Sequence, residues 1–239
     1  NMSAFYYCTH SLGPLVHISG LRPVSVTGFE APFNKKMARM GAKAGPFGVE
    51  MVTLENGAIL KSLHGVGSVK YSLWFAVQGD MGVIETQRNV AGTEGVNTLL
   101  MQGDRVEGSD DGLWTDVRTE DGLSDLAEGF DHGGGDYYLL YNACEAVKGN
   151  RQADIIGVYE ALDMFLPGLF AYYSVLEGGV TKDIPNLRNK EERDKWRNDT
   201  TCTDPKNPDY KCIPSYSKGN PEIPAEVYEK LKEKFDKDK

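Results

Sequence analysis

The sequence has 239 residues, of which 40% are hydrophobic and 26% are charged, and its formal net charge is −9. This is an ordinary composition for a soluble protein, and the length is sufficient to bury a large core. The acidic balance and the lack of a dense Lys/Arg cluster argue against nucleic acid as a partner, and no apolar run reaches the roughly 18 residues that would span a membrane.

The chain is predicted to begin with a helix and a strand. Residues 10 to 19 carry an apolar helical stripe that stops at Gly20. Residues 22 to 29 alternate with period two, which is typical of a strand. A helical turn is expected at residues 35 to 40.

Residues 48 to 117 read as strands. Asn56-Gly57 between two alternating runs is a strong hairpin pattern, and it predicts that residues 49–54 pair with residues 58–64. Further strands are expected at residues 70–78, 83–86, 98–101 and 114–117. The short loops between them favour antiparallel pairing.

The period then changes to that of helices, at residues 133–148, 158–176, 190–197 and from Pro224 onward. This order predicts an α+β fold with an open, mostly antiparallel sheet of about six or seven strands and helices on one face. We expect a single domain over residues 1–239, in which residues 190–239 form a peripheral, loop-rich and helical extension.

The first candidate site is the pair Tyr7 and His10, at the start of the first predicted helix. An imidazole can give and take protons near neutral pH, and a phenol three residues earlier can share a substrate hydroxyl. The alternative is structural: a histidine that caps the helix beside a tyrosine that fills the core.

The second candidate is His132-Gly133-Gly134-Gly135-Asp136. Glycines allow the backbone to approach a ligand closely at the start of a helix. His132 and Asp136 bracket the turn and could bind a sugar hydroxyl. The alternative is a flexible entry into a helix.

Other chemistry finds little support in the sequence. No Walker A, G-x-G-x-x-G, G-x-S-x-G or H-E-x-x-H motif occurs, and His17 and His64 are expected to be packing or surface residues. The cysteines contain no C-x-x-C pair, so no metal site is expected. Cys202 and Cys212 flank a loop that a disulfide could close, and two free thiols are the alternative. No secretory leader is recognisable, which favours the cytoplasm.

Tyr7-Cys8-Thr9-His10-Ser11-Leu12-Gly13-Pro14, with the later His132-Gly133-Gly134-Gly135-Asp136, resembles the C-terminal domain of the Gfo/Idh/MocA oxidoreductases. The closer resemblance is to the NAD-dependent glycosidases of glycoside hydrolase family 109, whose patterns are Y-P-T-H-G-L-G-P and H-G-G-x-D. Cys8 and Ser11 depart from the first pattern, whereas Tyr7 and His10 match it.

This resemblance implies an enzyme in which an N-terminal Rossmann domain holds NAD. Because the sequence lacks that domain's motif, we expect a C-terminal fragment that binds no cofactor itself, beyond possible contact from Tyr7. The implied reaction is glycoside hydrolysis by transient oxidation at C3, elimination and re-reduction. His10 and Tyr7 would be catalytic, and His132, Gly133, Gly134 and Asp136 would bind the carbohydrate.

Two alternatives belong to the same resemblance. The parent could be an NAD(P)-dependent sugar or cyclitol dehydrogenase. The chain could instead be a non-catalytic oligomerisation domain, because the family often assembles homo-oligomers through the open face of the sheet.

Overall fold

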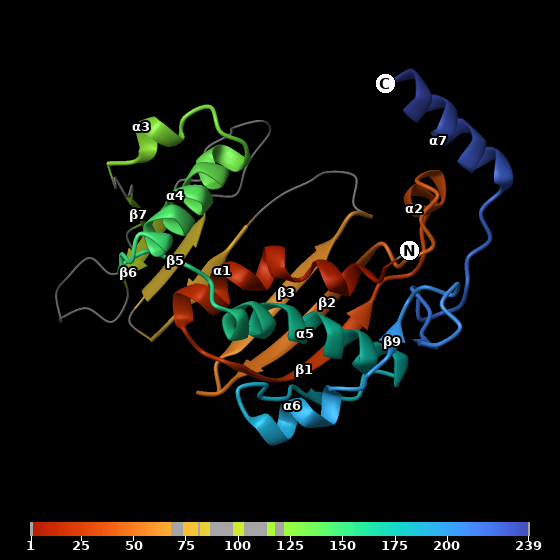
Figure 1. The fold of residues 1–239 in the computed structure, drawn as a ribbon, viewed down its shortest axis with the longest axis horizontal. Helices are drawn as coiled ribbons and strands as arrows, with labels where there is room; N and C mark the ends of the chain where they lie inside the picture. The colour runs from red at the N-terminus through yellow and green to blue at the C-terminus, as the bar shows by residue number, and fades with distance from the viewer. Residues whose placement is uncertain are drawn as a thin grey trace. The chain divides into compact units, whose positions relative to one another are not determined.

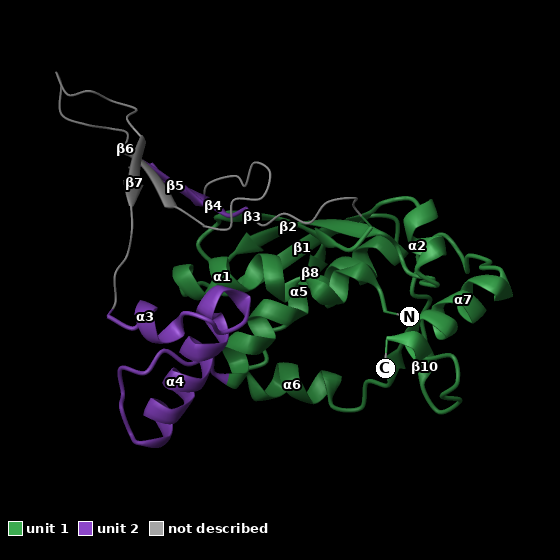
Figure 2. Cartoon of the chain, turned by 90° about the horizontal axis from the view of Figure 1, so that it is seen from above, with its two compact units in different colours: residues 1–71, 158–239 green, residues 72–157 purple. Residues whose placement is uncertain are grey.

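The structure, a computed structural model, describes residues 2–67, 74–80, 82–86, 98–102, 114–117 and 122–238. The chain divides into two compact units, residues 1–71 with 158–239 and residues 72–157 (Figure 2). The Tyr7–His10 motif belongs to the first unit and the glycine-rich motif to the second.

The first unit is built on a four-stranded antiparallel sheet in the order β3-β2-β1-β8. Its strands are β1 (Pro23–Glu30), β2 (Phe47–Leu54), β3 (Ile59–Gly65) and the short β8 (Lys182–Asp183). The predicted hairpin is confirmed, because β2 and β3 pair in register on either side of Asn56-Gly57.

Two long helices cover one face of this sheet. They are α1 (Thr9–Ser19), which follows the 3-10 turn η1 (Ala4–Tyr7), and α5 (Val158–Leu176). Figure 1 shows α1 and α5 side by side across the sheet. The other helices described in the unit are α2 (Lys35–Arg39), α6 (Lys190–Trp196) and α7 (Ala225–Lys237).

The core lies between these two helices and the sheet. Alternate residues of β2, including Val52 and Leu54, point toward the helices, as the period of a strand requires. The buried residues of the core are Phe5, Cys8, Leu12, Val16, Val26, Val52, Leu54, Met164, Leu166, Phe170, Ala171, Tyr172 and Ile184.

A segment near the C-terminus also packs on this unit. The Tyr172 hydroxyl donates a hydrogen bond to the Pro214 carbonyl (2.5 Å), and the buried Tyr216 hydroxyl accepts one from the Phe33 amide (3.0 Å). The amide and hydroxyl of Ser217 both donate to the carboxylate of Glu30 at the end of β1.

The second unit contains another antiparallel sheet, with its four strands in sequence order. These are β4 (Ala76–Gln78), β5 (Gly82–Thr86), β6 (Thr98–Gln102) and β7 (Trp114–Val117). The strand predicted at residues 70–78 lies partly outside the described residues. The unit also holds α3 (Ser124–Ala127), the 3-10 turn η2 (His132–Gly134) and α4 (Gly135–Val147).

The α+β class and the mainly antiparallel pairing are confirmed, but the single sheet of six or seven strands is wrong. The described strands pair in two separate four-stranded sheets, with a small parallel pair of β9 (Thr201–Cys202) and β10 (Lys211–Cys212). Alternation predicts which residues share a strand face, but strand pairing across a long connection depends on tertiary packing. Among the described helices, none is long and apolar enough to cross a membrane.

Candidate functional site

The structure brings Tyr7 and His10 together. Their rings are stacked, with centroids 4.0 Å apart and planes 9° from parallel. Tyr7 is 50% exposed and His10 is also exposed, so the phenol and the imidazole both face solvent. The pair therefore presents two proton-carrying groups on one accessible surface.

The local helix geometry explains why these two side chains point outward. Side chains three residues apart lie on the same side of a 3-10 turn. Phe5 and Cys8 are fully buried on the inner side, which leaves Tyr7 and His10 on the outer side. The Cys8 thiol donates to the Met164 carbonyl of α5 (3.4 Å), and burial raises its pKa strongly.

A buried polar cluster lies behind this turn. The Ser11 hydroxyl is 2.6 Å from the Ser62 hydroxyl, which is 3.0 Å from His64 Nδ1. His64 Nδ1 is also 3.4 Å from Glu50 Oε1, and Glu50 has no exposed surface. Burial raises the pKa of Glu50 to about 8 and lowers the pKa of His64 to about 4.

His64 packs in the core, which is one of the two places expected for it. Its polar partners Ser11, Ser62 and Glu50 were not predicted. The pattern did contain evidence for one of them: Glu50 stands in β2 between Gly48 and Val52, on the face that alternation assigns to the core. A carboxyl group on an apolar strand face is unusual unless it has a specific role or partner.

His132 and Asp136 also form a pair, in the second unit. His132 Nδ1 lies 2.8 Å from Asp136 Oδ1, and both side chains are accessible. Gly133 (φ 64°) and Gly134 (φ 91°) adopt the left-handed conformations that favour glycine. Among the described residues other than glycine, only His132 has a positive φ, at 57°.

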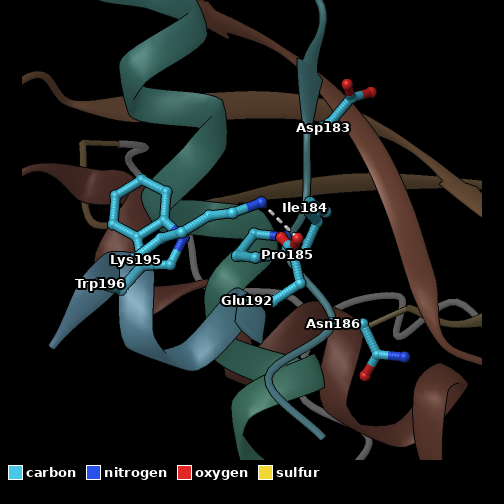
Figure 3. Close-up of a pocket in the computed structure, with 7 residues that line it drawn as sticks. All are labelled: Asp183, Ile184, Pro185, Asn186, Glu192, Lys195 and Trp196. Carbon is cyan, nitrogen blue, oxygen red and sulfur yellow. Dashed lines mark hydrogen bonds and ion pairs between the residues drawn. The ribbon is translucent and has the colours of Figure 1, made fainter. Parts of the chain in front are cut away.

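A pocket of about 350 Å³ lies elsewhere, between α6 and the segment that follows β8. Figure 3 shows Lys195 and Trp196 of α6 on one side and Ile184 and Pro185 on the other. Lys195 forms an ion pair with Glu192 (2.5 Å), three residues earlier on the same helix. Asp183 and Asn186 complete the lining, so no residue of either predicted motif belongs to the pocket.

Within the described residues, neither candidate motif fits a metal or a dinucleotide. No group of three or more His, Cys, Asp and Glu side chains suited to a metal ion occurs in the part of the chain that the structure describes. The glycine turn before α4 would have to receive the pyrophosphate of NAD, but Asp131 and Asp136 flank it. Carboxylates at this helix start oppose the binding of an anion.

Two sequence comparisons with known proteins point to the same family. The model of the glycosyl hydrolase 109 C-terminal domain matches residues 19–197, a range that includes the glycine-rich motif and begins after the Tyr7–His10 motif. A glycosyl hydrolase family 109 protein of Parabacteroides distasonis is 23% identical over 202 residues, which are 76% of this chain and 42% of that protein. The chain thus spans less than half of this relative.

Two solved structures share the fold. An aldose-aldose oxidoreductase from Caulobacter crescentus superposes with a TM-score of 0.54 at 16% identity, over 74% of this chain and 46% of that one. An oxidoreductase domain protein from Kribbella flavida gives a TM-score of 0.50 at 12% identity, over 73% and 48%. Because the family model matches residues 19–197, which are most of its length, the chain belongs to the glycosyl hydrolase 109 C-terminal domain family.

Proposed function

We propose that residues 1–239 are the substrate domain of an NAD-dependent glycosidase, which acts by transient oxidation of the sugar at C3, elimination and re-reduction. The observation that carries the proposal is the accessible stack of Tyr7 and His10. Its backbone is anchored on both sides by buried residues, as a catalytic group requires.

In this proposal the chain supplies proton transfer and sugar binding. The His10 imidazole can donate a proton to the leaving glycosidic oxygen or accept one from the sugar. The Tyr7 phenol, which is stacked on the His10 ring, donates a hydrogen bond to the sugar near the same glycosidic oxygen. The accessible His132–Asp136 pair would bind sugar hydroxyls, with Gly133 and Gly134 allowing close approach of the backbone.

The hydride chemistry belongs to NAD, and we propose that it is bound by a Rossmann domain elsewhere in the full-length protein. In this proposal the residues of this chain take no part in hydride transfer.

We also propose that the protein is a homo-oligomer that assembles through the open face of the first sheet. That face carries exposed Phe29, Met51, Ile59 and Leu63, on three neighbouring strands. A surface of this kind favours burial against a second copy.

Nitrophenyl glycosides test the enzymatic proposal in the full-length protein. A glycosidase of this type releases nitrophenol and leaves no net NADH, because the hydride returns to the product. Net formation of NADH from a free sugar, with no cleavage of any glycoside, would instead identify a sugar dehydrogenase and refute the proposal.

A further inference from the structure

The buried cluster behind the His10 turn consists of four residues on three elements, and we call it the buried network. Ser11 belongs to α1, Glu50 to β2, and Ser62 and His64 to β3. Glu50 and Ser62 are covered by η1 and α1, and the ring of Phe5 packs edge-on against His64, with centroids 5.6 Å apart. Polar groups so fully removed from water depend on one another for hydrogen bonds.

Burial favours the neutral forms of both Glu50 and His64. An ionised carboxylate needs several hydrogen-bond donors, yet neither Glu50 oxygen has a hydrogen bond of good geometry within the described parts of the chain, and the nearby Ser62 hydroxyl offsets only part of the rise that burial causes in the pKa of Glu50. Its nearest imidazole nitrogen is 3.4 Å away, which is long for an ion pair. The Cys8 thiol and His64 are the titratable groups that face it, and neither carries a charge there.

The proton on His64 can be placed by counting donors. On Nε2 it would be a buried N–H without a partner among the described residues. On Nδ1 it lies 3.0 Å from the Ser62 hydroxyl. The Ser11 hydroxyl gives its one proton to the Cys8 carbonyl, so the Ser62 hydroxyl donates to Ser11, and the contact between Ser62 and His64 then needs the imidazole proton on Nδ1.

This tautomer gives the remaining hydrogen bonds a single direction. His64 donates to Ser62, Ser62 donates to Ser11 (2.6 Å), and Ser11 donates to the Cys8 carbonyl (3.0 Å). The same carbonyl accepts the amide protons of Ser11 and Leu12, which form the first turn of α1. The chain of donors therefore ends on the turn that carries His10.

We propose that the buried network holds the first turn of α1 against β3 and so positions His10 against Tyr7. The Cys8 side chain provides no cap at the start of α1, so this turn depends on tertiary contacts. Ser11, Ser62 and His64 position the turn that carries His10. Glu50, whose neutral form is favoured by burial, places no charge beside His64. The inference rests on the proposed function only where His10 acts as a catalyst.

Ser11→Ala provides the sharpest test, because two explanations predict opposite signs. Alanine is the better helix former, so local propensity alone predicts slower amide hydrogen exchange in the first turn. The buried network predicts exchange about fivefold to tenfold faster at positions 11 and 12, with the Gly20 amide at the far end of α1 unchanged. Unchanged or slower exchange at both positions overturns the proposal.

The ring of His10 reports its position directly. In the wild type, stacking on Tyr7 shifts the His10 ring protons upfield in the proton NMR spectrum, and Ser11→Ala and Ser62→Ala should both reduce this shift. Ser25→Ala, on the open face of the neighbouring strand β1, is the matched control and should leave it unchanged. A full upfield shift in both network variants contradicts the proposal.

Kinetics on the full-length protein separate this inference from the proposed function. If both are right, Ser11→Ala lowers kcat about tenfold and changes KM little. If the protein cleaves no glycoside but exchange and ring shifts change as expected, the network stands and the proposed reaction fails. If Ser11→Ala has a normal kcat and normal amide hydrogen exchange, the positioning role of the buried network is refuted and the proposed glycosidase reaction is not.

Discussion

Gly168 of α5 lies directly against Cys8, the residue that precedes α1. A Cβ atom at position 168 would stand 2.5 Å from the Cys8 sulfur and 2.1 Å from the Phe5 carbonyl oxygen. The close contact between α5 and the turn beneath Tyr7 and His10 therefore requires glycine at this point. The backbone that carries Tyr7 and His10 can pack this closely on α5 because residue 168 has no side chain.

Gly168→Ala should consequently lower the free energy of unfolding by about 3 kcal/mol, because the two backbones must separate. Urea denaturation measures the loss. Gly157→Ala is the control: its new methyl group would meet no atom within 4 Å, and stability should change by less than about 0.5 kcal/mol. Equal stability of the two variants would show that α5 can move freely.

His10→Ala should reduce kcat of the full-length enzyme about 10²- to 10⁴-fold if His10 is the general acid or base. Tyr7→Phe keeps the stacked ring and removes only the hydroxyl, so it should cost less. His17→Ala, farther along α1 and paired with Glu160, is the control and should retain activity. Near-normal turnover of His10→Ala would make His10 a structural residue.

Glu50 should make the protein less stable as the pH rises above 6.5. Its carboxyl keeps its proton in the folded state up to a pKa of about 8, but loses it near 4.5 when unfolded. The unfolded state thus binds fewer protons between these values, and the free energy of unfolding falls as pH rises. His64, with a folded pKa of about 4 against 6.5, has the opposite slope below pH 6.5.

The two effects oppose each other between pH 4.5 and 6.5, and only that of Glu50 remains from pH 6.5 to 8. Over this interval we expect a loss of about 2 kcal/mol in the wild type. Glu50→Gln cannot ionise and should remove most of that loss. Urea denaturation at the two pH values measures it, and an identical slope in both proteins would contradict the assignment.

His132→Asn should separate strain from function in the glycine turn. Asparagine tolerates the left-handed backbone at φ 57°, so stability should stay within about 0.5 kcal/mol of the wild type. Sugar binding should weaken about tenfold, because the imidazole beside Asp136 is lost. His132→Ala should be less stable by about 1 kcal/mol. Unchanged affinity in both variants would remove His132 from the binding site.

The cysteines should fall into two classes with a thiol reagent. All four are free; Cys144 and Cys212 are exposed and Cys202 is partly exposed, whereas Cys8 is buried. We expect the first three to react in the native protein and Cys8 only after unfolding, since burial also raises the pKa of its thiol. Rapid native reaction of all four would show that the turn at Cys8 opens readily.

Much of the fold could be predicted from local patterns. The apolar period of residues 158–176 gave the limits of α5, and Asn56-Gly57 gave the first hairpin, because in both cases the pattern is long or the turn specific. β8 could not be predicted, since a two-residue strand has no period. The division into two sheets could not be predicted either, because alternation within strands does not specify which distant edges pair.

The candidate site was predictable only in its outer part. A spacing of three placed Tyr7 and His10 on one side of a turn, and a spacing of four placed His132 beside Asp136. The buried network joins Ser11 to Ser62 and His64, which lie 51 and 53 positions later in the chain. Its assembly depends on strand register, which a residue pattern alone does not reveal.

The contacts of residues 214–217 affect how the protein should be produced. The family match ends at residue 197. Two residues within it have hydrogen-bond partners beyond it: Tyr172 donates to Pro214, and Glu30 accepts from Ser217. A recombinant protein ending at that boundary would lose the hydrogen-bond partners of the Tyr172 phenol and the Glu30 carboxyl group. The smallest piece worth expressing is therefore longer than the homologous domain, and extends at least through Ser217.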